Sequence, residues 1–76
     1  MIVFSKDRKT IAKCRALTVT KNFGGKKDEK YAIVGCISDG VIEQTMLALY
    51  PDEKTALDEL EKVYEAFAGG AKTYKL

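Results

Sequence analysis

The chain has 76 residues, a net charge of +2 and a hydrophobic content of 46%, and it contains no histidine. This length corresponds to one small domain with a single core and no cleft between domains. Without histidine, neither a Ser-His-Asp nor a Cys-His catalytic arrangement can form. A Walker-type loop and a dinucleotide fingerprint are also missing from the sequence. We therefore expect a protein that is not an enzyme and that uses no cofactor or metal.

The sequence predicts a cytoplasmic protein. It has no run of eighteen apolar residues that could span a membrane, and its start lacks the basic and apolar stretches of a secretory signal. Cys14 and Cys36 are too few for a disulfide scaffold and too far apart for a zinc knuckle. We expect both to be small buried side chains, and a bridge between strands or between subunits is the alternative.

The first part of the chain predicts two extended segments and a loop. Residues 1–5 form the first strand and residues 10–20 the second, with a charged turn between them. Apolar and charged residues exchange faces near Arg15, which predicts a bulge or bend there. Residues 22–28 are rich in glycine and lysine and predict a loop. Phe23 in this loop either packs back onto the edge of the domain or contacts a partner.

A β-hairpin is predicted over residues 31–38 and 41–50. Asp39-Gly40 between them indicates a two-residue turn, because a type I′ turn needs positive φ at both central positions. Such a turn fixes the pairing of the two strands. The facing pairs expected are Ser38 with Val41, Ile37 with Ile42, Gly35 with Gln44, Ile33 with Met46 and Tyr31 with Ala48.

Both faces of this hairpin are apolar, whereas an antiparallel sheet that faces water usually carries polar residues on one side. The face expected to pack on the core carries Tyr31, Ile33, Ile37, Ile42, Met46 and Tyr50. The opposite face carries Ala32, Val34, Val41, Leu47 and Leu49 beside Cys36, Glu43 and Thr45. We therefore expect this second face to be half-buried as well.

A helix is predicted over residues 52–68. Asp52 suits the N-cap, where its carboxylate accepts from the free amides of Lys54 or Thr55, and Gly69-Gly70 ends the helix with one glycine in the left-handed conformation. The apolar stripe consists of Ala56, Leu57, Leu60, Val63, Tyr64 and Phe67, and we expect it to lie on the sheet. The acidic side chains Asp58, Glu59, Glu61 and Glu65 indicate a solvated flank rather than a cation site, because no supporting ligands accompany them.

Together these elements predict one α+β domain over residues 1–76. Residues 1–50 form an antiparallel meander of about four strands, and residues 52–68 form one C-terminal helix that packs across it. Residues 71–76 form either a frayed tail or a short strand. Packing of the helix on the sheet is expected to be the main source of stability.

Charge is distributed unevenly along the chain. Residues 1–30 carry nine Lys or Arg and three acidic residues, a net of +6, whereas residues 31–76 carry four and eight, a net of −4. Solvated faces, self-association of basic and acidic halves, and contact with nucleic acid are the three interpretations. The nucleic-acid alternative would use Lys6, Arg8, Lys9, Lys13, Arg15, Lys26 and Lys27. It has neither an aromatic pair of the RNP type nor a recognition helix to support it.

Four short motifs follow one another in a recognisable order. They are Ser-Lys-Asp-Arg-Lys-Thr-Ile over 5–11, Tyr-Ala-Ile over 31–33, Asp-Gly over 39–40, and Leu-Ala-Leu-Tyr over 47–50 leading into Asp-Glu-Lys-Thr-Ala over 52–56. This order resembles that of small uncharacterised proteins of Gram-positive bacteria and their phages and prophages. The chain departs from that pattern in the loop around Phe23 and in its Gly-Gly tail. The resemblance implies a phage-related accessory role and no catalytic or ligand-binding residues.

The sequence therefore predicts a non-enzymatic binding protein. We expect it to act as a homodimer or higher oligomer through the apolar second face of the sheet, and to bind an unidentified protein partner. The candidate contact residues are Val34, Cys36, Val41, Leu47, Leu49 and, in the loop, Phe23. Contact of the basic N-terminal half with nucleic acid is the alternative function.

Overall fold

The computed structural model describes residues 1–36 and 44–76. The elements in chain order are β1 (Ile2–Phe4), β2 (Ile11–Lys13), β3 (Ala16–Lys21), β4 (Tyr31–Cys36), β5 (Gln44–Tyr50), α1 (Glu53–Ala68) and β6 (Thr73–Lys75). Several expectations lie outside the described residues: the Asp39-Gly40 turn, the positions of Ile37 and Ile42, and those of Ser38, Val41 and Glu43.

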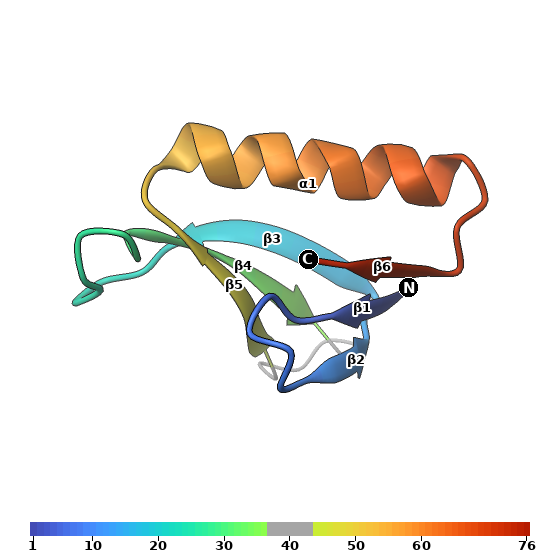
Figure 1. Cartoon of the computed structure of the whole chain (residues 1–76), viewed down its shortest axis with the longest axis horizontal. Coiled ribbons are helices and arrows are strands. Elements are labelled where there is room, and N and C mark those ends of the chain that lie inside the picture. The colour runs from blue at the N-terminus through green and yellow to red at the C-terminus, as the bar shows by residue number, and fades with distance from the viewer. Residues whose placement is uncertain (37–43) are drawn as a thin grey trace.

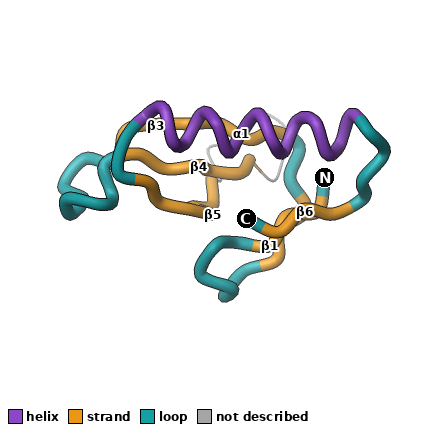
Figure 2. The backbone as a smooth tube through the Cα atoms, turned by 45° about the horizontal axis from the view of Figure 1, so that its top comes forward, coloured by secondary structure: helices purple, strands orange, loops and turns teal. Residues whose placement is uncertain are grey.

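The α+β fold class predicted from the sequence is confirmed. Antiparallel strands in the order β3-β4-β5 form one sheet, and α1 packs on it (Figure 1). The meander is divided, however, because β1 and β2 belong to a second three-stranded sheet in the order β2-β1-β6. In that sheet β6 lies parallel to β1. Figure 2 shows α1 running along β3, with the chain ends near β1 and β6.

The irregularity expected near Arg15 is present, and it separates the two sheets. The extended segment breaks after Lys13 and resumes at Ala16, so that β2 pairs with β1 and β3 pairs with β4. Main-chain hydrogen bonds hold both sides of the break: the Cys14 amide donates to Met1 O at 2.7 Å, and the Arg15 amide donates to Cys36 O at 2.8 Å. One continuous segment therefore supplies a strand to each sheet.

The pairing of β4 with β5 differs from the register that a two-residue turn would impose. Gly35 faces Thr45 rather than Gln44, and the register shifts again between Ile33 and Val34. Beyond that shift, Ile33 faces Ala48 rather than Met46, and Tyr31 faces Tyr50 rather than Ala48. The shift leaves Leu47 as an extra residue in β5, which is the definition of a β-bulge. The expectation that Met46 lies in the core is wrong, because its side chain is 50% exposed.

The bulge turns Leu47 into the interior of the domain. A Cβ built on Gly35 would lie 2.6 Å from Cys14 Sγ and 2.9 Å from Leu47 Cδ1. Side chains alternate along β4, so this is the same face as that of Ile33, which packs against the helix. Only glycine fits at position 35, since the Cys14 thiol and the Leu47 side chain occupy the space of a side chain.

The two sheets and the helix enclose one continuous interior. One cluster joins Val3 and Ala12 of the small sheet to Cys14 and Leu47, and the other joins Ile33, Ala48 and Tyr50 to Ala56 of α1. Leu17 and Leu76 contact both clusters. The small sheet and Phe67 of α1 therefore cover the first cluster together.

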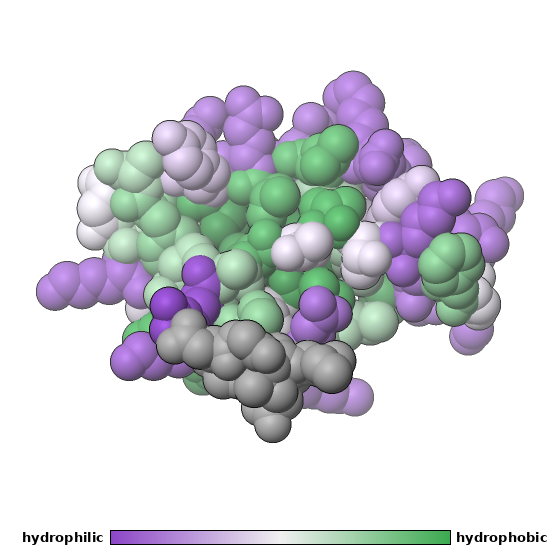
Figure 3. All heavy atoms as spheres, turned by 180° about the vertical axis from the view of Figure 1, so that it is seen from behind, coloured by the Kyte–Doolittle hydropathy of each residue, from purple (hydrophilic) through white to green (hydrophobic). Residues whose placement is uncertain are grey.

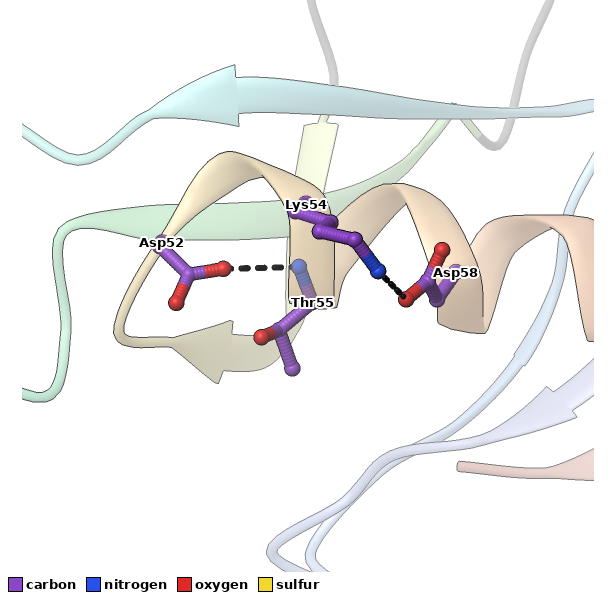
Figure 4. A network of polar contacts seen from close by, with 4 residues as sticks. All are labelled: Asp52, Lys54, Thr55 and Asp58. Atoms are coloured by element: carbon purple, nitrogen blue, oxygen red, sulfur yellow. Dashed lines mark hydrogen bonds and ion pairs between the residues drawn. The ribbon is translucent and has the colours of Figure 1, made fainter.

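The N-terminal end of α1 forms as predicted. The Asp52 carboxylate accepts a hydrogen bond from the Thr55 amide at 2.8 Å, and Lys54 pairs with Asp58 one turn further on at 3.0 Å (Figure 4). The carboxylate satisfies one of the free amides of the first turn and faces the positive end of the helix dipole.

The C-terminal end of α1 directs the chain back toward the sheet. Gly70 has φ +100°, so it is the glycine that adopts the left-handed conformation. The Ala71 amide donates to Ala66 O and the Gly70 amide donates to Phe67 O, which is the Schellman pattern. The reversal places residues 73–75 beside β1, where the Leu76 amide donates to Phe4 O at 3.0 Å. Of the two alternatives for the tail, the short strand is confirmed.

We predict that Leu47 and Met46, which are neighbours in β5, differ sharply in their contribution to stability. Leu47→Ala should lower the free energy of unfolding by about 2–5 kcal/mol, because it leaves a cavity among buried side chains. Met46→Ala should change it by less than about 0.5 kcal/mol, because the side chain is half-exposed. Urea denaturation measures both values. Equal losses, or a larger loss at Met46, would contradict the bulged register.

The capping carboxylate should make stability depend on pH. The hydrogen bond from the Thr55 amide lowers the pKa of Asp52 below 3.8. The folded pKa is the lower one, so the ionised group stabilises the fold above pH 3.8, and this contribution is lost as the pH falls through the lowered pKa. Asparagine caps helices as well but does not titrate.

Asp52→Asn should therefore lose less free energy of unfolding between about pH 5 and about pH 2 than the unchanged chain does. Urea denaturation at the two pH values provides the comparison. Some pH dependence should remain in both chains, because the Ser5 hydroxyl likewise lowers the pKa of Asp7. An identical loss in the two chains would show that the cap does not titrate as described.

Candidate functional site

The structure does not gather the expected contact residues on one exposed face. Leu47 lies in the core at 2% exposure, and Val34 is buried at 8%. Cys36 and Leu49 are half-buried, and Val41 lies outside the described residues. Leu47 was expected on the second face of the sheet, and that expectation is wrong because the bulge turns it inward.

Exposed apolar surface lies instead on the flank of α1 that is next to β3. Ala56 and Val63 of the predicted stripe are buried, and Leu60 and Phe67 are half-buried. The other two members of the stripe, Leu57 and Tyr64, are 47% and 72% exposed. Leu57 and Tyr64 are seven residues apart, two turns of helix, so they lie on the same flank. The apolar stripe is therefore wider than the surface that the sheet covers.

A groove runs between this flank and β3. Its cavity volume is about 520 Å³, and its lining is almost wholly apolar. The lining residues are Met1, Leu17, Leu60, Val63, Tyr64, Phe67 and Ala68. Figure 3 shows hydrophobic residues gathered below the helix on this side of the molecule. Sequence reasoning missed Met1 and Leu17 as members of this surface, although the width of the helical stripe was a signal that it exists.

The free edge of β3 lies beside the groove. Within the described residues, β3 pairs with β4 on one side and with no strand on the other. The Asn22 amide donates to Lys30 O at 2.8 Å, which makes this a hydrogen-bonded pair of the β3–β4 ladder. Bonded and non-bonded pairs alternate in an antiparallel ladder. The amides and carbonyls of Leu17, Val19 and Lys21 therefore point away from β4, toward the free edge.

The seven basic residues of the nucleic-acid alternative do not form one surface. Lys26 and Lys27 lie in the β3–β4 loop at one end of the molecule, and the others lie on the β1–β2 turn, on β2 and at the break before β3 (Figure 1). The Lys6 ammonium is engaged locally, at 3.4 Å from Leu49 O and 4.5 Å from the centre of the Tyr50 ring. The charge asymmetry of the sequence thus corresponds to separate basic regions.

Two titratable side chains inside the fold have shifted pKa values. Burial raises the pKa of the Cys14 thiol, and both cysteines are free thiols. Burial, with smaller effects from Glu59 and Tyr74, raises the pKa of Tyr50 to about 12. The Tyr74 hydroxyl donates to Glu59 at 2.8 Å, which ties β6 to the flank of α1 opposite the groove.

Residues 1–36 and 44–76 contain neither a cluster of metal ligands nor a membrane-spanning helix. No group of three or more Cys, Asp or Glu side chains there is placed to hold a metal ion. In the same residues, no helix combines the length and the apolar character needed to cross a bilayer.

Comparison with protein-family models, with curated proteins and with solved structures finds no match to this chain. The function of the chain is therefore inferred from the geometry of the groove and of the free edge of β3.

Proposed function

We propose that this protein is a non-enzymatic binding protein that forms a homodimer through the free edge of β3 and the adjacent flank of α1. The observation that carries this proposal is that exposed apolar side chains lie on the same side of the molecule as an edge of β3 that pairs with no other described strand. A second copy of the chain can satisfy both. The sequence pointed to self-association, and the exposed apolar side chains of the helix flank favour the edge of the sheet over its second face as the contact.

The edge of β3 is complementary to itself. If Val19 faces Val19 of the second copy in an antiparallel pair, Leu17 of each copy faces Lys21 of the other. The main-chain groups of Leu17, Val19 and Lys21 point outward. The pairs that these three residues form with the second copy are therefore the hydrogen-bonded pairs of the new ladder. The two sheets then join into one six-stranded sheet with an isologous interface.

The same arrangement covers the apolar flank of the helix. A two-fold axis perpendicular to the joined sheet places both helices on one face, side by side and antiparallel. Leu60 and Val19 pack against the same cluster, so the axis passes close to the middle of α1. Leu57 of each copy then lies near Tyr64 of the other. Each large apolar side chain that becomes fully buried contributes about 1.5–3 kcal/mol.

We expect the association to be weak. Leu57 and Tyr64 of each copy, four side chains in all, contribute together with one strand pairing. These contacts must offset the free-energy cost of lost translational and rotational freedom, which is about 4–15 kcal/mol. Glu61 lies between Leu57 and Tyr64 along the helix and approaches its counterpart in the second copy, which opposes association. A dissociation constant of about micromolar order is consistent with these contributions. Binding of a further protein, and the phage-related accessory role that the resemblance implies, remain proposals.

A charge on the helix flank should disrupt the dimer. Tyr64→Lys should weaken association by about tenfold or more, because it places an ammonium in the apolar contact. Ile11→Lys is the matched control, since Ile11 is similarly exposed at 69% but lies on the outer side of the small sheet. Sedimentation equilibrium measures the dissociation constants. A strictly monomeric unchanged chain, or equal effects of the two variants, would refute the proposal.

A second pair of variants tests the strand edge. Lys21→Pro removes an outward amide that is not needed by the β3–β4 ladder, and proline is tolerated at such positions on edge strands. It should abolish the dimer and leave the monomer folded, as judged by circular dichroism. Lys21→Ala removes the same side chain but keeps the amide, so it should dimerise normally. If both variants dimerise equally well, the second copy does not pair with β3.

A further inference from the structure

The β3–β4 loop holds Phe23 outward on a rigid support. The Phe23 side chain is 88% exposed, so the expectation that it packs back onto the domain is not met. The Asn22 side-chain amide donates to Glu29 O at 2.8 Å, and the Gly25 amide donates to Asn22 O at 3.2 Å. The Lys30 ammonium donates to Gly25 O at 3.3 Å. Phe23 thus projects from between two anchored residues.

Two glycines permit this conformation. Gly24 has φ +80°, a left-handed value that glycine adopts without strain. Gly25 approaches the main chain of Glu29 so closely that no Cβ could fit between them. Keeping a phenylalanine in water on a well-defined loop forgoes the stability that its burial would give. Such an arrangement is typical of a contact residue rather than of a packing residue.

Phe23 lines a hollow that also contains the ring of Tyr31 and the ammonium groups of Lys21 and Lys30. Its cavity volume is about 380 Å³, which is within the range of small-ligand sites. The lining residues are Lys21, Asn22, Phe23, Gly24, Lys30 and Tyr31. The Lys30 ammonium has three donors and uses one for Gly25, so further donors remain for a ligand.

We propose that this hollow binds a nucleoside phosphate unit, as in single-stranded nucleic acid, with the base stacked on Phe23 and the phosphate near Lys21 and Lys30. A base has a flat π-face that stacks on an exposed aromatic ring, and lysines beside the ring attract the phosphate. The segment from Lys21 to Lys30 carries four lysines and two acidic residues, so it is locally basic.

The shape of the site favours a flat ligand over a lipid surface. Insertion into a bilayer would require a convex apolar tip, whereas Phe23 borders a hollow that also contains Tyr31 and the Asn22 amide. This site lies in the basic N-terminal half but differs from the residues of the alternative function. It excludes the β1–β2 turn and β2, and it needs Lys21 and Lys30, which that set of residues did not include.

Phe23→Trp is the direct test. The chain has no tryptophan, so the new indole reports on this site alone, and it preserves the stacking surface. A ten-nucleotide oligothymidylate should quench its fluorescence, and the affinity should fall as the salt concentration rises. Ile11→Trp is the matched control, since Ile11 is 69% exposed on the outer side of the small sheet, and it should respond little. Equal quenching of the two variants would mean diffuse electrostatic contact and would overturn the proposal.

Two further ligands identify the source of the phosphate. Thymidine monophosphate that quenches Phe23→Trp as strongly per site as the oligonucleotide would assign the hollow to free nucleotides. A stronger effect of the oligonucleotide would assign it to nucleic acid. Vesicles of anionic phospholipid should leave the emission unchanged. A blue shift with vesicles and no response to either nucleotide would overturn the proposal, as would no response to any of the three.

Affinity in the chain without the probe provides an independent check. Phe23→Ala should weaken oligonucleotide binding by about 5- to 150-fold, the equivalent of about 1–3 kcal/mol of stacking. Phe23→Tyr should retain most of the affinity because it keeps the ring. Fluorescence anisotropy of a labelled oligonucleotide measures both. An alanine variant that binds like the unchanged chain would exclude stacking on Phe23.

Discussion

Contact of Leu47 and Cys14 with Val3 and Ala12 is the interaction on which the rest of the structure depends. It attaches the short strands of the β2-β1-β6 sheet to the β3-β4-β5 sheet, and Phe67 of α1 packs against the same cluster. The contact needs three local features: the break in the chain after Lys13, the bulge at Leu47 and the absence of a side chain at position 35. Small strands of three residues would have little stability without this packing.

Apolar surface remains on one flank of α1. The apolar stripe of the helix is wider than the surface that the strands cover, so Leu57 and Tyr64 stay in water. That flank borders the free edge of β3, where main-chain groups alternate toward solvent. A second copy can satisfy an edge strand and an apolar helix flank together, and this combination is what supports the proposal of self-association. The Phe23 loop follows β3, and Lys21 at the end of this strand belongs to both proposed contacts, through its main chain in the dimer and its side chain in the hollow.

Features fixed by local chemistry could be predicted from the sequence. The Asp52 cap, the left-handed glycine at the end of α1 and the break near Arg15 each depend on a few neighbouring residues. The register of β4 and β5 could not be predicted, because the bulge is favoured by the burial of Leu47 against a sheet that is distant in the sequence. For the same reason the groove was missed: Met1 and Leu17 join Tyr64 only after the chain has folded. Packing of Phe23 onto the domain was one of two predicted alternatives, and its exposure contradicts that one, whereas contact with a partner stays a prediction.

Hydrogen exchange of the β3 amides, followed by NMR at increasing protein concentration, tests the central claim most directly. The account predicts that the amides of Thr18 and Thr20 are protected at every concentration, because they bond to β4 within one chain. The amides of Leu17, Val19 and Lys21 should exchange rapidly in dilute solution and gain protection as the concentration rises. Rapid exchange of these three amides at all concentrations would contradict pairing of the edge with a second copy.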